Sequence, residues 1–201
     1  MRPSHRPAAL LLAAVTFLAG CLPAPAPTPA ADLASVAAAW QARQAALASR
    51  DRFLLLGRLA VKGGGLSGQL RWQQEGAGYR LRLAGPLGAG ALKIEGDGRE
   101  TRIAGRDIDL VTTEPEQVLA ARTGWMLPLA ALRWWVLGLP EPGEPADLQL
   151  DDRGRLVGLV QRGWTLRFEG YDAQQPALPG LVEARRGEAQ ATLRVESMAL
   201  Q

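Results

Sequence analysis

The chain contains few side chains that could do acid–base or nucleophilic chemistry. Its only histidine is His5 and its only cysteine is Cys21. Arg2, His5 and Arg6 precede an apolar run, a pattern typical of a secretory signal that is removed. The mature chain would then contain no imidazole. That excludes Ser-His-Asp and Cys-His catalysis as they are usually built, together with the common transition-metal clusters.

The carboxylates offer little more. Asp107 and Asp109 would share one face of a strand, but such a pair near a strand end is more typical of solvated edge residues than of an acid–base pair. Asp151 and Asp152 suit a turn. The stretches "GGGLSG" and "GPLGAG" lack the lysine and the strand-to-helix context of a phosphate-binding loop. We therefore expect no enzyme, no cofactor and no metal site.

Cys21 has a different use. It follows "AALLLAAVTFLAG", an apolar run shorter than the ~20 residues of a spanning helix. The local sequence "LAGC" resembles the bacterial lipobox, whose cysteine becomes the acylated N-terminus. A lone cysteine in an exported chain has no internal disulfide partner. We expect residues 1–20 to be a cleaved signal and Cys21 to carry lipid; the alternative is an ordinary signal with a chance cysteine. Leu22 rather than Asp fits outer-membrane retention.

The charge does not indicate nucleic-acid binding. The chain has 23 basic and 20 acidic residues, and the signal removes Arg2 and Arg6. The remaining basic residues are spread along strands among acids, without the continuous basic block that binds phosphate backbones.

The mature chain divides into a tether and one domain. Residues 21–31, "CLPAPAPTPAA", alternate proline with small residues and predict an extended spacer of up to ~3.1 Å per residue. Residues 32–201 form the domain, because a composition of 47% hydrophobic and 21% charged residues suits one globular core.

Three helices are expected. Asp32 is a candidate N-cap for a helix that ends near Ser49. Residues 112–124 and 127–138 each contain a proline near the start and a glycine at the end, which is typical of short helices. The apolar stripe of the first helix comprises Leu33, Val36, Ala37, Trp40 and Leu47.

Elsewhere the apolar residues alternate with polar ones, which predicts antiparallel strands separated mostly by hairpin turns. The expected strands are 53–62, 68–74, 79–85, 90–96, 101–105, 107–112, 146–150, 155–162, 164–170, 179–186 and 189–196. The fold class is mainly β, with α+β character.

Several motifs together point to one family. In order they are the lipobox, an early helix with Trp40, "GRLAVK", "LRWQQ", "YRLRLAGPLGAGAL", "TGWMLPLAALRWWVLGLP", "GW" and "GYD". This ordered set closely resembles the LolB family, the outer-membrane lipoprotein receptors of Gram-negative bacteria. One departure is "SMA" at 197–199, where the family pattern has an aromatic, and it leaves the packing of the last strand open.

The resemblance implies an open, incomplete antiparallel β-barrel of about eleven strands. A helical lid would cover it and enclose an apolar cavity for acyl chains. It also implies a function: the protein accepts triacylated lipoproteins from a periplasmic carrier of the LolA type and releases them into the outer membrane. The protein would face the periplasm, act as a monomer, bind no nucleic acid and need no ATP.

The inward strand faces and the lid are the candidates for the acyl-chain cavity. Adjacent Trp134 and Trp135 project about 100° apart on a helix, so a core explains one of them and a lipid-lined cavity could explain both. The predicted lining comprises Leu59, Leu70, Trp72, Leu81, Leu83, Leu92, Ile94, Leu166, Phe168, and from the lid Leu129, Leu132 and Trp135.

A second candidate site is the turn Pro86-Leu87-Gly88, where a leucine stands in place of the usual polar turn residue. Pro86 fixes one backbone angle and Gly88 frees the next, so Leu87 should project from a hairpin tip. The resemblance aligns this turn with the family's protruding loop, whose apolar tip contacts the membrane. The alternative is a leucine folded back onto the sheet.

A different class of function stays open. The same sheet and lid could belong to a tethered lipid-binding or structural lipoprotein of the cell envelope. Such a protein would hold a lipid rather than deliver a protein.

Overall fold

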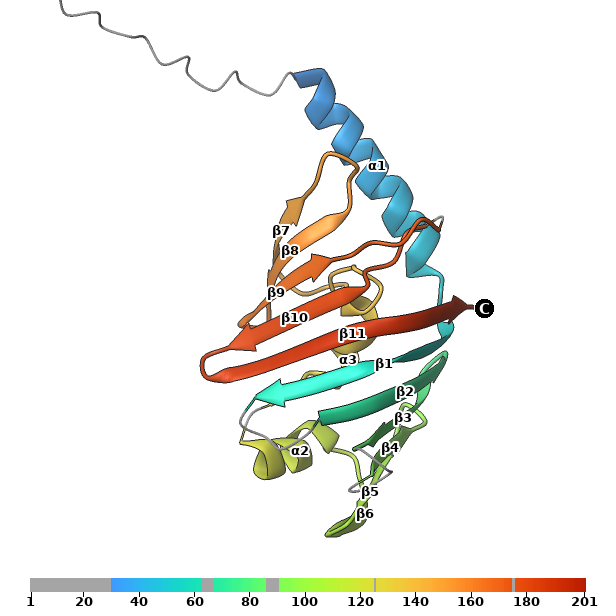
Figure 1. Cartoon of the computed structure of the whole chain (residues 1–201), viewed down its shortest axis with the longest axis vertical. Helices are drawn as coiled ribbons and strands as arrows, with labels where there is room; N and C mark the ends of the chain where they lie inside the picture. Colours follow the sequence, from blue (N-terminus) through green and yellow to red (C-terminus); the bar gives the residue numbers. More distant parts are fainter. Residues whose placement is uncertain (1–29, 63–66, 86–90, 125, 175) are drawn as a thin grey trace, which may run out of the picture.

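The computed structural model describes residues 30–62, 67–85, 91–124, 126–174 and 176–201. They form one sheet of 11 strands in the order β6-β5-β4-β3-β2-β1-β11-β10-β9-β8-β7 (Figure 1). Every neighbouring pair is antiparallel. β6 and β7 are its two edges and do not pair with each other, so the barrel is open. The predicted open antiparallel sheet of about eleven strands is confirmed.

The strands lie where the alternation of apolar residues predicts them. Their bounds are β1 Arg52–Lys62, β2 Ser67–Glu75, β3 Gly78–Ala84, β4 Leu92–Gly96, β5 Thr101–Gly105, β6 Ile108–Thr112, β7 Ala146–Leu150, β8 Leu156–Gln161, β9 Trp164–Glu169, β10 Leu181–Arg186 and β11 Ala189–Leu200. β1 pairs with β11, so the first and last strands join the two halves of the sheet.

Three helices accompany the sheet in the described part of the chain. α1 spans Ala30–Ala48, α2 spans Pro115–Thr123 and α3 spans Leu129–Trp135. α2 and α3 lie in the segment that connects the two edge strands, β6 and β7, and α3 lies behind the middle of the sheet in Figure 1. α2 is capped after Thr123 by Gly124, whose positive φ of 79° is left-handed. These two helices form the lid.

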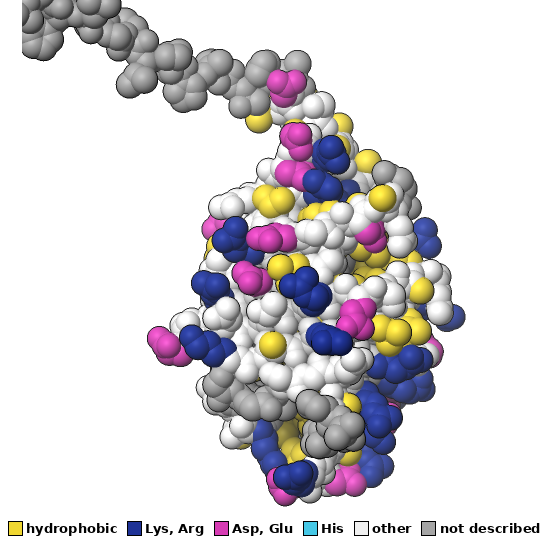
Figure 2. All heavy atoms as spheres, in the orientation of Figure 1, with side chains coloured by type: hydrophobic (Ala, Val, Ile, Leu, Met, Phe, Trp, Pro, Cys, Tyr) yellow, Lys and Arg dark blue, Asp and Glu magenta, His cyan; other side chains and the backbone are white. Residues whose placement is uncertain are grey.

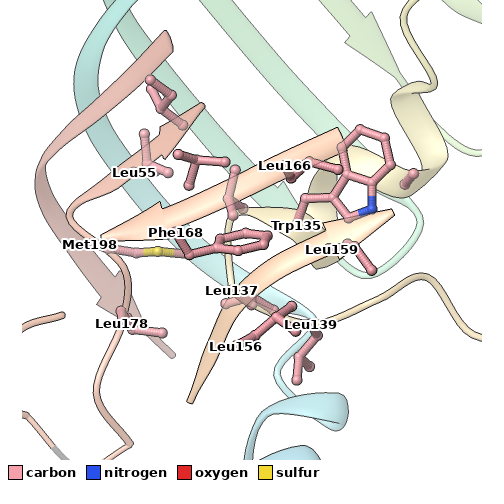
Figure 3. Packing of buried hydrophobic residues seen from close by; sticks show 14 of the residues in the cluster. Leu55, Trp135, Leu137, Leu139, Leu156, Leu159, Leu166, Phe168, Leu178 and Met198 are labelled. Carbon is pink, nitrogen blue, oxygen red and sulfur yellow. The ribbon is translucent and has the colours of Figure 1, made fainter. Parts of the chain in front are cut away.

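The core lies between the sheet and α3. Trp135, Leu159, Leu166 and Phe168 are buried side by side in it (Figure 3). A smaller cluster joins α2 to the sheet through Leu119, Ile94 and Ile103. The lid is therefore held by two separate apolar clusters.

α1 differs from the sequence prediction. It begins at Ala30, before the proposed Asp32 cap, because alanines are strong helix formers. Leu33 is 61% exposed and Ala37 is also exposed, since this half of the helix projects beyond the body in Figure 1. Trp40 and Leu47 are buried as predicted.

Two features attach α1 to the body. Gly154, with φ of +67°, lies so close to α1 that a Cβ there would come within 2.6 Å of the backbone nitrogen of Trp40. Buried Arg43 donates hydrogen bonds to the carbonyl oxygens of Ala177 and Leu137. It therefore connects α1 to the segment that follows α3.

The last strand is longer than predicted and continues to Leu200 instead of ending at 196. A bulge between Leu56 and Gly57 of β1 shifts the register opposite Glu196. Beyond it, Met198 pairs with Leu55 and is buried near Phe168. Met198 thus packs in the core at the end where the family pattern has an aromatic.

Candidate functional site: an apolar cavity under the lid

A cavity of about 130 Å³ lies between the sheet and the lid. Strands from both halves of the sheet contribute to it, because the sheet curves around the lid. Its lining comprises Leu59, Val61, Leu70, Trp72, Leu81, Leu83, Leu92, Ile94, Leu119, Leu127, Leu129, Leu132, Trp135, Val136, Trp164, Leu166, Val182, Ala184, Ala191 and Leu193.

The structure brings together all the residues proposed for the lining except Phe168. Phe168 follows Trp164 and Leu166 on the same face of β9, and those two border the cavity. Phe168 itself is 2% exposed and packs in the core near Met198 (Figure 3). A period of two identifies the face of a strand, but it does not tell which positions along that face adjoin the cavity.

Other lining residues were missed by the sequence analysis. Val61 lies on the face already identified for β1, and alternation in β10 and β11 would have found Val182, Ala184, Ala191 and Leu193. No periodic signal marks Leu127, because it precedes α3 in an irregular segment.

The lining is suited to hydrocarbon. Among the described residues that line it there is no ionisable side chain, and their one kind of polar side-chain group is the indole nitrogen of the tryptophans. The Trp72 indole donates to the Gln74 side chain at 3.0 Å and the Trp135 indole donates to the Gln161 side chain at 2.9 Å. Those two N–H groups are satisfied, and apart from the indole of Trp164 the rest of this lining is hydrocarbon. A dry apolar cavity of this kind can hold a benzene-sized molecule at about 150 Å³.

The C-terminal end of α3 is firmly held. Trp135 is 1% exposed, and its ring lies 6.4 Å from that of Trp164. Gln161 of β8, which accepts the Trp135 indole, also accepts from the Glu141 backbone nitrogen at 2.9 Å and donates to the Glu141 carbonyl. Adjacent Trp134 is half-buried beneath the Arg133 guanidinium, which lies 4.4 Å from the ring centre.

A polar pocket of about 380 Å³ adjoins the cavity and shares Trp72, Leu81, Leu129 and Leu132 with it. Its remaining lining includes Gln74, Tyr79, Arg99, Thr101, Glu116, Arg133, Trp134 and Glu141. The hydroxyls of Tyr79 and Thr101 lie 2.9 Å apart. Burial raises the pKa of Tyr79 above 10.0, against the effect of that hydrogen bond. An amphipathic molecule could place its chain in the cavity and its polar end here.

Two of the candidate carboxylates, those of Asp109 and Asp151, have structural roles. Asp107 lies in the β5–β6 turn rather than on the strand, and its backbone carbonyl accepts a hydrogen bond from Arg122. Asp109 forms two hydrogen bonds with Arg102, which lower its pKa. Asp151 accepts from the backbone of Arg153 and Arg155 in the predicted turn. Among the described residues there is no acidic, histidine or cysteine cluster that could hold a metal.

Cys21, Pro86, Leu87 and Gly88 lie outside the described residues. Within the part of the chain that the structure covers, no helix is long and apolar enough to cross a bilayer.

Comparison with known proteins gives one structural match and several sequence matches. The crystal structure of LolA superfamily protein NE2245 from Nitrosomonas europaea matches with a TM-score of 0.49 at 10% identity, over 83% of this chain and 94% of that one. Outer-membrane lipoprotein LolB of Nitrosococcus oceani is 38% identical over 86% of this chain and 87% of its own length. The protein of the same name from Stutzerimonas stutzeri is 32% identical over 90% and 89%.

The family described as "Outer membrane lipoprotein LolB" matches residues 51–197. The match runs from the first strand to the bulged part of the last one. It therefore includes the sheet, the lid and the cavity. The chain belongs to the LolB family of outer-membrane lipoproteins.

Proposed function

We propose that this protein accepts triacylated lipoproteins from a periplasmic carrier of the LolA type and inserts them into the outer membrane. The observation that carries the proposal is the apolar cavity beneath a two-helix lid, in a chain of the LolB family. The protein acts as a monomer on the periplasmic side of that membrane and performs no covalent step.

The physical task requires such a cavity. Each acyl methylene exposed to water costs ~0.8 kcal/mol, so three long chains cannot cross the periplasm unshielded. A receptor that binds them better than the carrier does, but less well than a bilayer, lets transfer run downhill without an energy source. A lining without ionisable groups suits this intermediate role.

The cavity must enlarge to receive acyl chains, because about 130 Å³ is close to the volume that holds one benzene. We assign the movement to α2 and the first turn of α3. Among the described residues of α2, Leu119 is the one fully buried side chain, helped by half-buried Val118 and by the Arg122 hydrogen bond to the Asp107 carbonyl. Leu129 and Leu132 are only half-buried. The other end of α3 stays in place through Trp135 and Gln161.

Two sites from the sequence analysis complete the proposal. Lipid on Cys21 anchors the protein, and residues 22–29 connect it to α1. Leu87 contacts the bilayer during release. Full burial of one leucine gains only ~1.5 to 3 kcal/mol, which is too little to anchor the protein but enough to bias a tethered body toward the surface.

A transfer assay tests the function. The purified carrier loaded with a lipoprotein is mixed with this protein, separated and assayed for the client, and vesicles are then added to the complex. We expect the client to move to this protein and then into the vesicles. If the protein binds free phospholipid but takes no client from the carrier, it is a tethered lipid-binding lipoprotein instead.

A further inference from the structure

Three cations stand side by side on the outer face of the sheet. The register places Arg71 of β2 opposite Arg82 of β3, and Arg82 opposite Lys93 of β4. All three are exposed. No ion pair joins any of them to an acidic side chain within the described ranges. We name Arg71, Arg82 and Lys93 the basic row.

The neighbouring row on the same face is arranged differently. There the register places Glu95 of β4 between Arg80 of β3 and Arg102 of β5. Arg102 also forms an ion pair with Asp109 at 2.8 Å. Charges therefore alternate in sign one row away, which is the arrangement that stabilises a sheet.

The basic row works against folding. Like charges directly opposite each other on adjacent strands destabilise a sheet, and here two such pairs share Arg82. A third like-charged pair, Arg58 with Arg194, lies opposite across β1 and β11, although Glu196 binds Arg58 at 2.9 Å. Figure 2 shows Lys and Arg side chains gathered at the lower right of the molecule, where Figure 1 places β2 to β5. Because this arrangement costs stability, it is explained by an anionic partner that binds the three cations.

We propose that the basic row is a docking surface for the anionic headgroups of a phospholipid bilayer. The inference rests on the proposed function, which keeps a bilayer within reach of the tethered body. Strands lie about 4.8 Å apart, so the three cations span roughly 10 Å of one sheet face. That spacing lets several headgroups be contacted at once, whereas a single phosphate would require converging side chains.

The position of the row sets the orientation of the protein. The N-terminal end of α1, where the tether joins, lies at the β7–β8 end of the molecule, and β2 to β4 lie toward the other end (Figure 1). A flat surface that meets both the tether and the basic row must run along the long axis. The protein therefore lies on its side on the bilayer, held at one end by lipid and at the other by charge.

The test measures vesicle binding without a client or a lipid anchor. Residues 22–201 contain every helix and strand described. This chain is floated with vesicles of phosphatidylcholine alone and of phosphatidylcholine mixed with phosphatidylglycerol. We expect binding to the anionic vesicles only, and weaker binding as salt rises.

A matched pair of triple variants separates the row from net charge. The row variant is Arg71→Gln/Arg82→Gln/Lys93→Gln. The control, Arg153→Gln/Arg167→Gln/Arg185→Gln, removes the same charge from exposed positions on β9, on β10 and in the β7–β8 turn, in the other half of the molecule. A basic residue near an anionic surface contributes about fivefold in affinity. The row variant should lose on the order of a hundredfold, and the control less than about fivefold.

The thermal stability of the row variant shows whether a loss of vesicle binding is caused by misfolding. Because Arg82→Gln removes both like-charge contacts, it should raise the melting temperature by about 1 to 3 °C, while Arg102→Gln should lower it. Binding lost with stability kept or gained supports the docking role.

Three results would overturn the inference. They are wild-type affinity of the row variant for anionic vesicles, an equal loss in the control variant, or equal binding to neutral vesicles. If the row variant still binds vesicles but takes no client from the carrier, the partner of the basic row is an acidic protein surface and not a bilayer. Failure of the wild-type protein to take client, with vesicle binding as expected, would instead count against the proposed function.

Discussion

The indole nitrogen of Trp135 donates a hydrogen bond to the side-chain oxygen of Gln161 at 2.9 Å, and both residues are almost fully buried. This bond joins the lid helix α3 to β8. The same oxygen accepts from the Glu141 backbone nitrogen, so Gln161 also fixes Glu141 in the segment that follows the lid.

Gln161→Leu should lower the free energy of unfolding by about 3 kcal/mol or more, because it leaves the Trp135 indole and the Glu141 N–H buried without acceptors. Urea unfolding measures the loss. The control is Gln69→Leu at an exposed position of β2, with an expected change of at most about 0.5 kcal/mol. Equal effects of the two changes would mean that Gln161 does not hold the lid.

Ala184→Leu should fill part of the cavity and weaken the binding of a fluorescent fatty-acid probe, because Ala184 borders it. Ala104→Leu adds the same three carbon atoms on the outer face of β5 and should leave probe binding unchanged. Probe titration with both variants distinguishes the cavity from an outer binding site. Undiminished binding by Ala184→Leu would contradict the cavity as the acyl site.

Leu83→Arg tests the same cavity by charge. Leu83 is 7% exposed and borders the cavity, so an arginine there should abolish probe binding, since an unpaired charge is costly in an apolar site. Because the buried charge could also unfold the domain, circular dichroism must first show a folded variant. A folded variant that binds the probe like the wild type would refute the assignment of this face.

Leu87→Glu should leave folding and uptake from the carrier nearly intact but block transfer into vesicles, because a charged tip resists entry into hydrocarbon. The transfer assay measures the two steps separately. Val111→Glu, at an apolar position that is 60% exposed on β6, is the control and should transfer normally. Normal delivery by Leu87→Glu, or loss of uptake together with delivery, would remove the membrane-contact role.

The β7–β8 turn should make stability depend on pH. Burial acts to raise the pKa of Asp151, but hydrogen bonds from Arg155 and Arg153 outweigh it and hold this pKa below 3.8. A carboxylate whose pKa is lowered by folding stabilises the protein at pH values above its pKa in the unfolded state. That stabilisation is lost as the pH falls through the pKa in the folded state. Asp151→Asn should therefore cost roughly 2 kcal/mol at pH 7 and much less in strong acid. Urea unfolding at pH 7 and in strong acid measures the loss, with the exposed substitution Asp152→Asn as control. An equal loss of unfolding free energy at the two pH values would disprove the linkage.

The sequence predicted the sheet well, because each half-buried strand shows its period of two directly. The strands about Leu70 and Trp72, and about Leu81 and Leu83, lie where that period puts them. α1 was predicted less well, since helical periodicity marks a stripe of apolar residues but not how far the body extends beneath it. Leu33 belongs to that stripe and is nevertheless exposed.

The polar sites depend on contacts distant in sequence. Arg43 and Leu137 are 94 positions apart, and their hydrogen bond has no local signal. The basic row illustrates the same limit: its members come from three strands, and the linear sequence contains no basic block. Only the register between strands brings Arg71, Arg82 and Lys93 together.

The unpaired edges of β6 and β7 have a mechanical consequence. A closed barrel has a circumference fixed by its ladder of hydrogen bonds, so its interior cannot swell unless some of them break. This sheet is an incomplete barrel, because its strand order ends at β6 on one side and at β7 on the other. Among the described residues, the lid segment connects these two edge strands. Widening the barrel would leave all ten ladders intact and would strain the contacts between the lid and the sheet, among them those at Leu119 and Trp135. The strength of those contacts therefore sets how readily the interior adapts to cargoes of different bulk.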